Sequence, residues 1–106
     1  MSETIRALMA ELKAGLGQLY RDQLKGVYLY GSYARGEQDA ESDLDVLIVL
    51  RQIGQYGAEV DRTGRLTSTL SLKHGVSISR VFVSERDWLD RDTPFLENAR
   101  EEAILA

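Results

Sequence analysis

Apolar residues recur at steps of three and four over the first part of the chain. They are Ile5, Leu8, Met9, Leu12, Leu16, Leu19 and Tyr20. On a helix this spacing places all of them on one face, so the pattern predicts an amphipathic helix over residues 3–24, with Gly26 as its stop signal. The β-prone residues 27–30 run directly into Gly31 and predict a first strand that ends in a turn.

The centre of the chain carries an apolar run over residues 44–50, interrupted only by Asp45. A run without alternation is typical of a strand that is buried on both faces, so we expect a central strand here. The polar segment 36–42 before it predicts a loop. Gly54 and Gly57 flank a predicted turn.

The second half of the chain predicts a helix over about residues 58–73, followed by a third strand over 76–83. We expect Val60, Leu66 and Leu70 to face inward. Gly64 lowers the helix propensity, and Gly75 is expected to end the helix. Ser84 with Asp87 predicts the cap of a short helix that carries Trp88 and Leu89. Thr93-Pro94 predicts the start of a last helix, with Phe95, Leu96, Ala99 and Ile104. This order predicts an α/β or α+β fold, a small mixed sheet with helices packed on it.

Composition narrows the classes of function. The 106 residues suit one domain, 1–106, and the absence of cysteine excludes disulfides and thiolate chemistry. No apolar stretch reaches the about 20 residues of a membrane span, and the N-terminus does not resemble a signal peptide, so a cytoplasmic location is expected. A net charge of −4 argues against a broad nucleic-acid surface but is compatible with a nucleotide carried by Mg²⁺.

One motif carries candidate chemistry: Gly31-Ser32, ten residues, then Asp43-Leu44-Asp45. Glycine lets the backbone bend sharply and approach a ligand, and a serine hydroxyl beside backbone N–H groups suits phosphate oxygens. Alternate residues of a strand project from the same face, so both carboxylates lie together. Two hard oxygen donors opposite a phosphate-holding turn are what a Mg²⁺–nucleotide complex requires.

The motif resembles the nucleotidyltransferase superfamily and, within it, the minimal nucleotidyltransferases, over Gly31-Ser32-Tyr33-Ala34-Arg35-Gly36 and Ser42-Asp43-Leu44-Asp45 with the apolar run that follows. The resemblance implies a polymerase-beta-like fold. It also implies transfer of a nucleoside monophosphate from a nucleoside triphosphate to a hydroxyl acceptor, with ATP as the expected nucleotide. It implies that Gly31 and Ser32 hold the β- and γ-phosphates, that Asp43 and Asp45 bind two Mg²⁺ ions, and that Arg35 is a further phosphate contact.

The chain departs from the family pattern at one point. Active members usually carry a third carboxylate on a later strand, yet residues 76–83 contain no Asp or Glu, and Arg80 is expected near that position. Glu85 and Asp87 follow the strand and are poor substitutes. Three hypotheses stay open: an active transferase with a divergent third ligand, a domain that binds nucleotide without turnover, and a protein-binding module whose motif is a relic.

The resemblance also implies a partner. Small stand-alone members of the family are commonly paired with a helical HEPN protein and act as its antitoxin, by modifying it or by covering it. A homo-oligomer stays open. Trp88, Leu89 and Phe95 are candidates for a contact surface, although we expect Trp88 and Phe95 to pack in the core.

Other polar residues favour structural roles. We interpret His74, the only histidine, as a helix cap or a solvated residue, and Tyr33 as a residue that serves packing or solubility. Three glutamates of the last helix, Glu97, Glu101 and Glu102, are expected to form a solvated face.

Overall fold

The computed structural model describes residues 1–106. Its elements, in chain order, are α1 (Glu3–Tyr20), the short 3-10 helix η1 (Arg21–Gln23), β1 (Leu24–Tyr30), α2 (Ser32–Arg35), β2 (Leu44–Leu50), α3 (Tyr56–His74), β3 (Ile78–Ser84), α4 (Glu85–Asp90), α5 (Pro94–Glu102) and β4 (Ile104–Leu105). None of the helices combines the length and the apolar character that crossing a bilayer requires.

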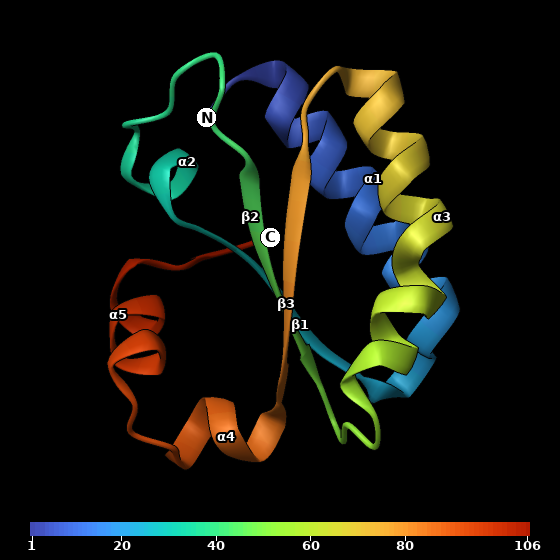
Figure 1. Ribbon diagram of the computed structural model, residues 1–106, viewed down its shortest axis with the longest axis vertical. Helices are drawn as coiled ribbons and strands as arrows, with labels where there is room; N and C mark the ends of the chain where they lie inside the picture. The colour runs from blue at the N-terminus through green and yellow to red at the C-terminus, as the bar shows by residue number, and fades with distance from the viewer.

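The four strands form one mixed sheet in the order β3-β2-β1-β4 (Figure 1). β1 is antiparallel to both β2 and β4, whereas β2 and β3 are parallel. The predicted central strand is confirmed with the same ends, and every residue of β2 except Asp45 is buried. This α/β arrangement is the predicted fold class.

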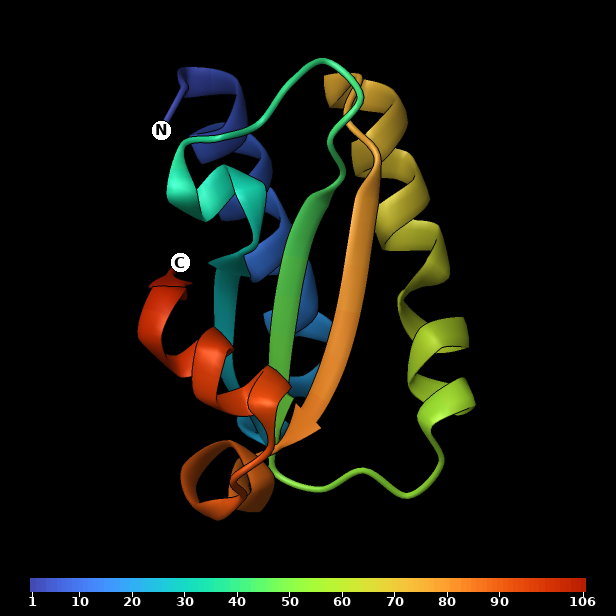
Figure 2. The same cartoon turned by 60° about the vertical axis from the view of Figure 1, so that its left-hand side comes forward.

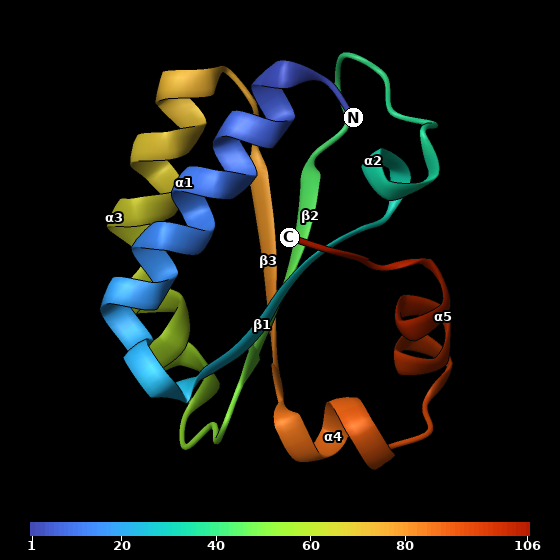
Figure 3. The same ribbon diagram turned by 180° about the vertical axis from the view of Figure 1, so that it is seen from behind.

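Helices cover both faces of the sheet, which explains why β2 is apolar without alternation. α1 and α3 lie on one face, and α5 lies on the other (Figures 2 and 3). The larger core lies under α1 and α3 and includes Leu8, Leu12 and Leu16 of α1 with Val46 and Ile48 of β2. The smaller core consists of Leu47, Val49, Val83, Leu96 and Ala99. Successive β2 residues therefore enter different cores.

The first helix is shorter than its periodicity predicts. α1 ends at Tyr20, and Arg21 takes a positive φ of 52° where the chain turns. Residues 21–23 and Leu24 leave the helix because Leu24 pairs with Leu50 in the sheet. The prediction that Gly26 stops the helix is wrong, since Gly26 lies inside β1 at a register shift. Leu19, predicted on the apolar face, is exposed.

The second half follows the prediction with two corrections. The Ser84 hydroxyl accepts from the Asp87 N–H at 3.2 Å, and the Thr93 hydroxyl accepts from the Leu96 N–H at 3.2 Å, so both predicted caps are confirmed. Ile104 is not helical, because it pairs with Leu29 as part of β4. In α3 the fully inward positions include Thr63 and Thr67 besides the predicted leucine at 70; Val60 and Leu66 are only half-buried.

Candidate active site

The two halves of the Gly-Ser and Asp-x-Asp motif meet at one end of the sheet. β1 delivers the chain to Gly31 and β2 starts at Leu44, and in the antiparallel register Tyr30 lies opposite Asp45. α2 and the loop that follows it connect the two strands (Figure 1). Sheet pairing therefore brings together Tyr30 and Asp45, which are fifteen positions apart in the sequence.

Position 31 requires glycine for two reasons, its backbone conformation and the close approach of Asp45. Its φ of 74° and ψ of −154° lie in a region that residues with a side chain rarely occupy. A Cβ atom built on Gly31 would lie 2.2 Å from Oδ2 of Asp45. The carboxylate of Asp45 thus lies directly against the backbone of Gly31, in space that any other residue would fill.

Ser32 begins the single turn of α2, which ends at Gly36 in the left-handed conformation. The Arg35 N–H donates to the Gly31 carbonyl at 3.1 Å, and the Glu37 N–H donates to the Ser32 carbonyl at 2.9 Å. The first N–H groups of a helix have no partner within it, so those at the start of α2 remain available beside the Ser32 hydroxyl. Tyr33 packs against the larger core, as predicted.

Asp43 and Asp45 form a pair of like charges at this end of β2. Asp43 is exposed and Asp45 is half-buried. Burial raises the pKa of the Asp45 carboxyl above its usual range, the negative charge of Asp43 raises it further, and the positive charge of Arg35 opposes both. Because two carboxylates on one face gain from a shared cation, this donor set fits a divalent metal ion that prefers oxygen.

The structure places no third acidic side chain beside this pair. In the parallel register Asp45 lies opposite Ser79 of β3, and no group of three or more histidine or acidic residues suited to a metal occurs in the chain. Arg80 lies one residue past Ser79, near this position as expected, but it does not set a positive charge beside Asp45. The Arg80 guanidinium points to α3, where Nε donates to the Thr63 hydroxyl and Nη2 donates to the Val60 carbonyl, each at 2.8 Å. Alternation along β3 separates Arg80 from the face that carries Asp45.

Arg35 reaches the mouth of a small cavity of about 240 Å³ beside Gly31. Its guanidinium pairs with Glu102 of α5 at 3.2 Å and with Glu37 at 3.3 Å. The prediction that Glu102 belongs to a solvated face is therefore wrong, whereas Glu97 and Glu101 are exposed as predicted. The N–H groups of the Arg35 guanidinium, which could bind a phosphate, are therefore paired with carboxylates in this structure.

Tyr30 is a site residue that the sequence interpretation missed. Its pKa is raised to about 12, first by burial and then by the negative charges of Asp45 and ionised Tyr56. Its ring packs edge to face against Phe95 with centroids 5.7 Å apart. The sequence could have indicated Tyr30. It ends the first predicted strand, and pairing that strand with the predicted central strand places it beside the aspartates of the motif.

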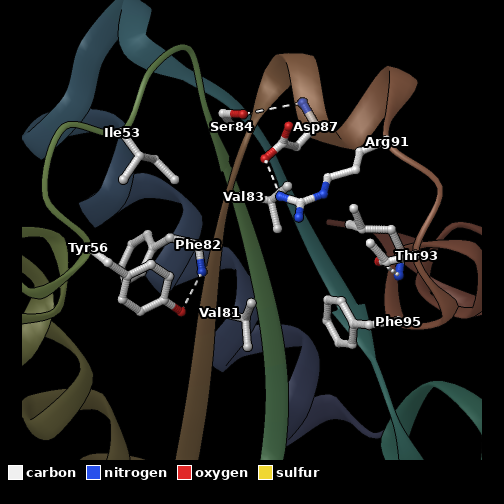
Figure 4. A pocket seen from close by; sticks show the side chains of 11 residues that line it. Ile53, Tyr56, Val81, Phe82, Val83, Ser84, Asp87, Arg91, Thr93 and Phe95 are labelled. Carbon is white, nitrogen blue, oxygen red and sulfur yellow. Dashed lines mark hydrogen bonds and ion pairs between the residues drawn. The ribbon is translucent and has the colours of Figure 1, made fainter.

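A larger cavity of about 390 Å³ opens further along the same face of the sheet. Figure 4 shows Tyr56 and Phe82 on one side, Phe95 on the other, and Val81 and Val83 between them. Phe95 also borders the smaller cavity beside Gly31. The expectation that Phe95 packs in the core is wrong, since this side chain is exposed at the cavity instead.

The remaining singled-out residues lie elsewhere. His74 is the last residue of α3, with Gly75 as the cap, and its imidazole contacts the carboxylate of Glu11 on α1. Trp88 is half-buried, with its ring 4.9 Å from that of Tyr28, whereas Leu89 is exposed.

Comparison with known proteins identifies the family. A model of the nucleotidyltransferase domain matches residues 9–99. Two Methanocaldococcus jannaschii proteins, each named "putative protein adenylyltransferase", are similar to this chain. One is 36% identical over 74 residues, covering 70% of this chain and 74% of the relative. The other is 39% identical over 75 residues, covering 71% and 69%.

Solved structures share the fold. A "putative minimal nucleotidyltransferase" superposes with a TM-score of 0.55 at 31% identity, over 93% of this chain and 92% of that chain. A toxin–antitoxin crystal structure with AMP-PNP gives a TM-score of 0.59 at 21% identity, over 88% of this chain and 70% of that chain. With the family model spanning most of the sequence, and with the glycine turn and paired aspartates at one end of the sheet, this chain belongs to the nucleotidyltransferase domain family and is similar to its minimal members.

Proposed function

We propose that this protein transfers a nucleoside monophosphate from Mg²⁺-bound ATP to a hydroxyl group of a partner protein. The observation that carries the proposal is the close approach of the Asp45 carboxylate to the backbone of Gly31, where the turn that we propose to hold phosphate begins. Membership of the family supports the reaction class. The names of the M. jannaschii relatives support adenylyl transfer and a protein acceptor.

The residues of the motif would bind different parts of the Mg²⁺–nucleotide complex. Asp43 and Asp45 would hold Mg²⁺, and their mutual repulsion favours a cation between them. When bound, the ion supplies positive charge that neutralises phosphate oxygens and polarises the phosphorus. Ser32 and the first N–H groups of α2 would bind the terminal phosphates. Arg35 would exchange its carboxylate partners for phosphate oxygens.

The direction of the reaction follows from this placement. The acceptor oxygen forms a bond to the α-phosphorus, the bond from that phosphorus to the bridging oxygen breaks, and pyrophosphate leaves with the bonding electrons. In an in-line displacement the attacking and leaving oxygens lie on opposite sides. Gly31 and Ser32 would hold the departing pyrophosphate, and the acceptor hydroxyl would attack from the opposite side of the α-phosphorus. The hydroxyl proton passes to water, because Ser79, opposite Asp45, is no base at neutral pH.

A second candidate function rests on Ser79, which lies opposite Asp45 where a third carboxylate is expected. β3 therefore supplies no carboxylate there to act as a general base, and the loss of such a base costs about 10²–10⁴-fold in rate. In this candidate the protein neutralises a helical partner by forming a complex, with or without bound nucleotide. The toxin–antitoxin neighbour supports a toxin as the partner, and the family resemblance supports a HEPN protein. An antitoxin role fits both candidates.

Transfer of labelled ATP tests the two candidates directly. The chain is purified with the helical protein that accompanies it, and label on that protein is measured with Mg²⁺ present. We expect label with the native chain and with the control Glu41→Ala, which alters an exposed loop acid, but none with Asp43→Ala/Asp45→Ala. No product with any divalent metal would refute the transferase. A complex that persists in the double variant would then support the second candidate, and loss of that complex would count against it.

A further inference from the structure

A groove runs between α1 and α3 on their solvent-exposed side. Glu11 contacts Lys73 near one end of the pair and Tyr20 contacts Glu59 near the other, so the two helices are antiparallel (Figure 3). The groove holds a cavity of about 430 Å³. Both helices contribute to its lining, at Gly15 and Leu19 of α1 and at Arg62, Arg65 and Leu66 of α3.

Apolar side chains form the floor of this groove and extend beyond it. A Cβ atom built on Gly15 would lie 2.6 Å from Cδ1 of Leu66, so the glycine leaves room for Leu66 to lie against α1. Leu19 is 43% exposed. Leu72, three residues after Thr69 on the same face of α3, is 84% exposed. Because burial of apolar surface is favourable, these leucines offer contacts that the two cores of the chain do not use.

Two arginines give the groove a positive charge. Arg62 is held in place, because its Nη1 lies 3.7 Å from Oε1 of Glu59 and its Cζ lies 5.5 Å from the centroid of the Tyr20 ring. Arg65 takes part in none of the ion pairs of the chain. No acidic side chain lines the groove, although the chain as a whole carries a net charge of −4. A negatively charged ligand is therefore favoured here.

The groove fits a helix better than an extended segment. Both walls are helices whose backbone groups bond within the helix, so an extended chain would find no strand with which to pair. A third helix, in contrast, packs readily along two antiparallel helices. From Arg62 to Leu72 the surface extends ten residues along α3, or about 15 Å. This length corresponds to about three turns of a bound helix.

We propose that the groove between α1 and α3 binds an acidic, amphipathic helix of a partner protein. The apolar face of that helix packs on Leu19, Leu66 and Leu72, and its carboxylates pair with Arg62 and Arg65. A second copy of this chain does not supply these groups through the same surface. A two-fold contact would set Arg65 of one copy against Arg65 of the other, and like charges repel.

The groove and the candidate active site lie on opposite sides of the sheet. Asp45 shares its face of β2 with Leu47 and Val49, which belong to the smaller core with residues of α5, whereas α1 and α3 cover the larger core. A helix in the groove therefore leaves Gly31 and Asp45 open. Binding of the helix is thus independent of nucleotide transfer.

Two synthetic helices test this surface by fluorescence anisotropy with the full chain. Both are hydrocarbon-stapled peptides of about 12 residues with leucines along one face. One carries glutamates beside the leucines, and the other carries lysines at the same positions. We expect the native chain to bind the glutamate helix at least about tenfold more tightly than the lysine helix.

Charge reversal and loss of an apolar contact give further expected results. Arg65→Glu should weaken binding of the glutamate helix by about three- to tenfold and strengthen binding of the lysine helix. Leu72→Ser should weaken binding of both helices by about three- to tenfold. Arg86→Glu makes the same charge change at an exposed residue of α4 outside the groove, and it should change neither affinity at physiological salt. Thermal unfolding of each variant confirms that it is folded.

Several outcomes would overturn the proposal. They are no binding of the glutamate helix, equal binding of both helices, and an unchanged affinity in folded Arg65→Glu. Amide chemical shifts that move in α4 and α5 instead of α1 and α3 would also contradict it. Self-association of the native chain that Leu72→Ser abolishes would assign the groove to a second copy. The Asp43→Ala/Asp45→Ala variant should bind the glutamate helix as the native chain does, which separates this surface from nucleotide transfer.

Discussion

Substitution of Gly31 by alanine tests whether the two halves of the motif depend on each other. The added methyl group would lie 2.2 Å from Oδ2 of Asp45, whereas real contacts of this kind are not shorter than 3.0 Å. The carboxylate must therefore retreat by the difference, about 0.8 Å. A misplacement of about 1 Å at a reacting group costs about 10²-fold, so we expect nucleotide transfer to fall by about that factor.

The same substitution strains the backbone. At φ 74° and ψ −154°, a residue with a side chain costs about 1–3 kcal/mol of folding free energy. For a domain of this length, each kcal/mol lowers the Tm by about 4–8 °C. We therefore expect Gly31→Ala to lower the Tm and the nucleotide affinity together.

Urea unfolding and Mg²⁺–ATP titration measure the two effects, and two further variants separate them. Gly75→Ala also places a side chain at a positive φ, 67°, in the milder left-handed region with ψ 31°, and its methyl group meets nothing within 4 Å. It should destabilise the fold by about 1–2 kcal/mol and leave nucleotide binding unchanged. In an Asp45→Ala background, Gly31→Ala should retain only the backbone part of its cost, because the carboxylate that the methyl group would meet is gone. If Gly31→Ala costs no more stability than Gly75→Ala and keeps its nucleotide affinity, the contact with Asp45 does not organise the site.

Further predictions follow from three charged groups. Asp45→Asn should raise the free energy of unfolding at pH 7, because the pKa of Asp45 is raised in the fold and its ionisation therefore costs stability as the pH rises past the ordinary value of 3.8. Urea unfolding below that pH should show no gain, and a loss of stability at pH 7 would contradict the argument. The hydrogen bonds of Glu11 with Lys73 and then with His74 lower the pKa of Glu11, so their contribution is present above the ordinary pKa of 4.5 and is lost as the pH falls below it. Glu11→Gln should accordingly lower the Tm at pH 7 and leave it unchanged at acid pH; an equal loss at both would point to packing instead of charge. Arg80→Met should destabilise the fold by about 1–3 kcal/mol through its lost hydrogen bonds and leave the Mg²⁺–ATP affinity unchanged. A weakened affinity would show that Arg80 contributes to nucleotide binding.

Local patterns predicted the elements on which the site is built. The apolar run gave the ends of β2, and the Ser84 and Thr93 caps located the last two helices, because hydrogen bonds within four residues decide these features. The spacing of the motif placed both aspartates on one face of a strand. The end of α1 was not predictable in the same way, since Leu24 continues the helical pattern but gains its partner Leu50 only in the sheet.

Long-range pairing decided how those elements become a site. Arg80 faces α3 because the parallel register of β2 and β3 sets Ser79 beside Asp45, and the mixed sequence of β3 does not fix which alternate residues face which layer. Glu102 pairs with Arg35 because α5 returns across the sheet near α2. Such contacts join residues far apart in the chain.

The sequence by itself therefore determined the family and the residues that we propose hold phosphate and metal, because a glycine turn and alternate carboxylates on one strand are local features of the chain. Only the tertiary structure set Asp45 against the bare backbone of Gly31 and opened a cavity between Tyr56 and Phe95. The physical reason is that strand register and helix packing, which join distant segments, fix which side chains share a surface.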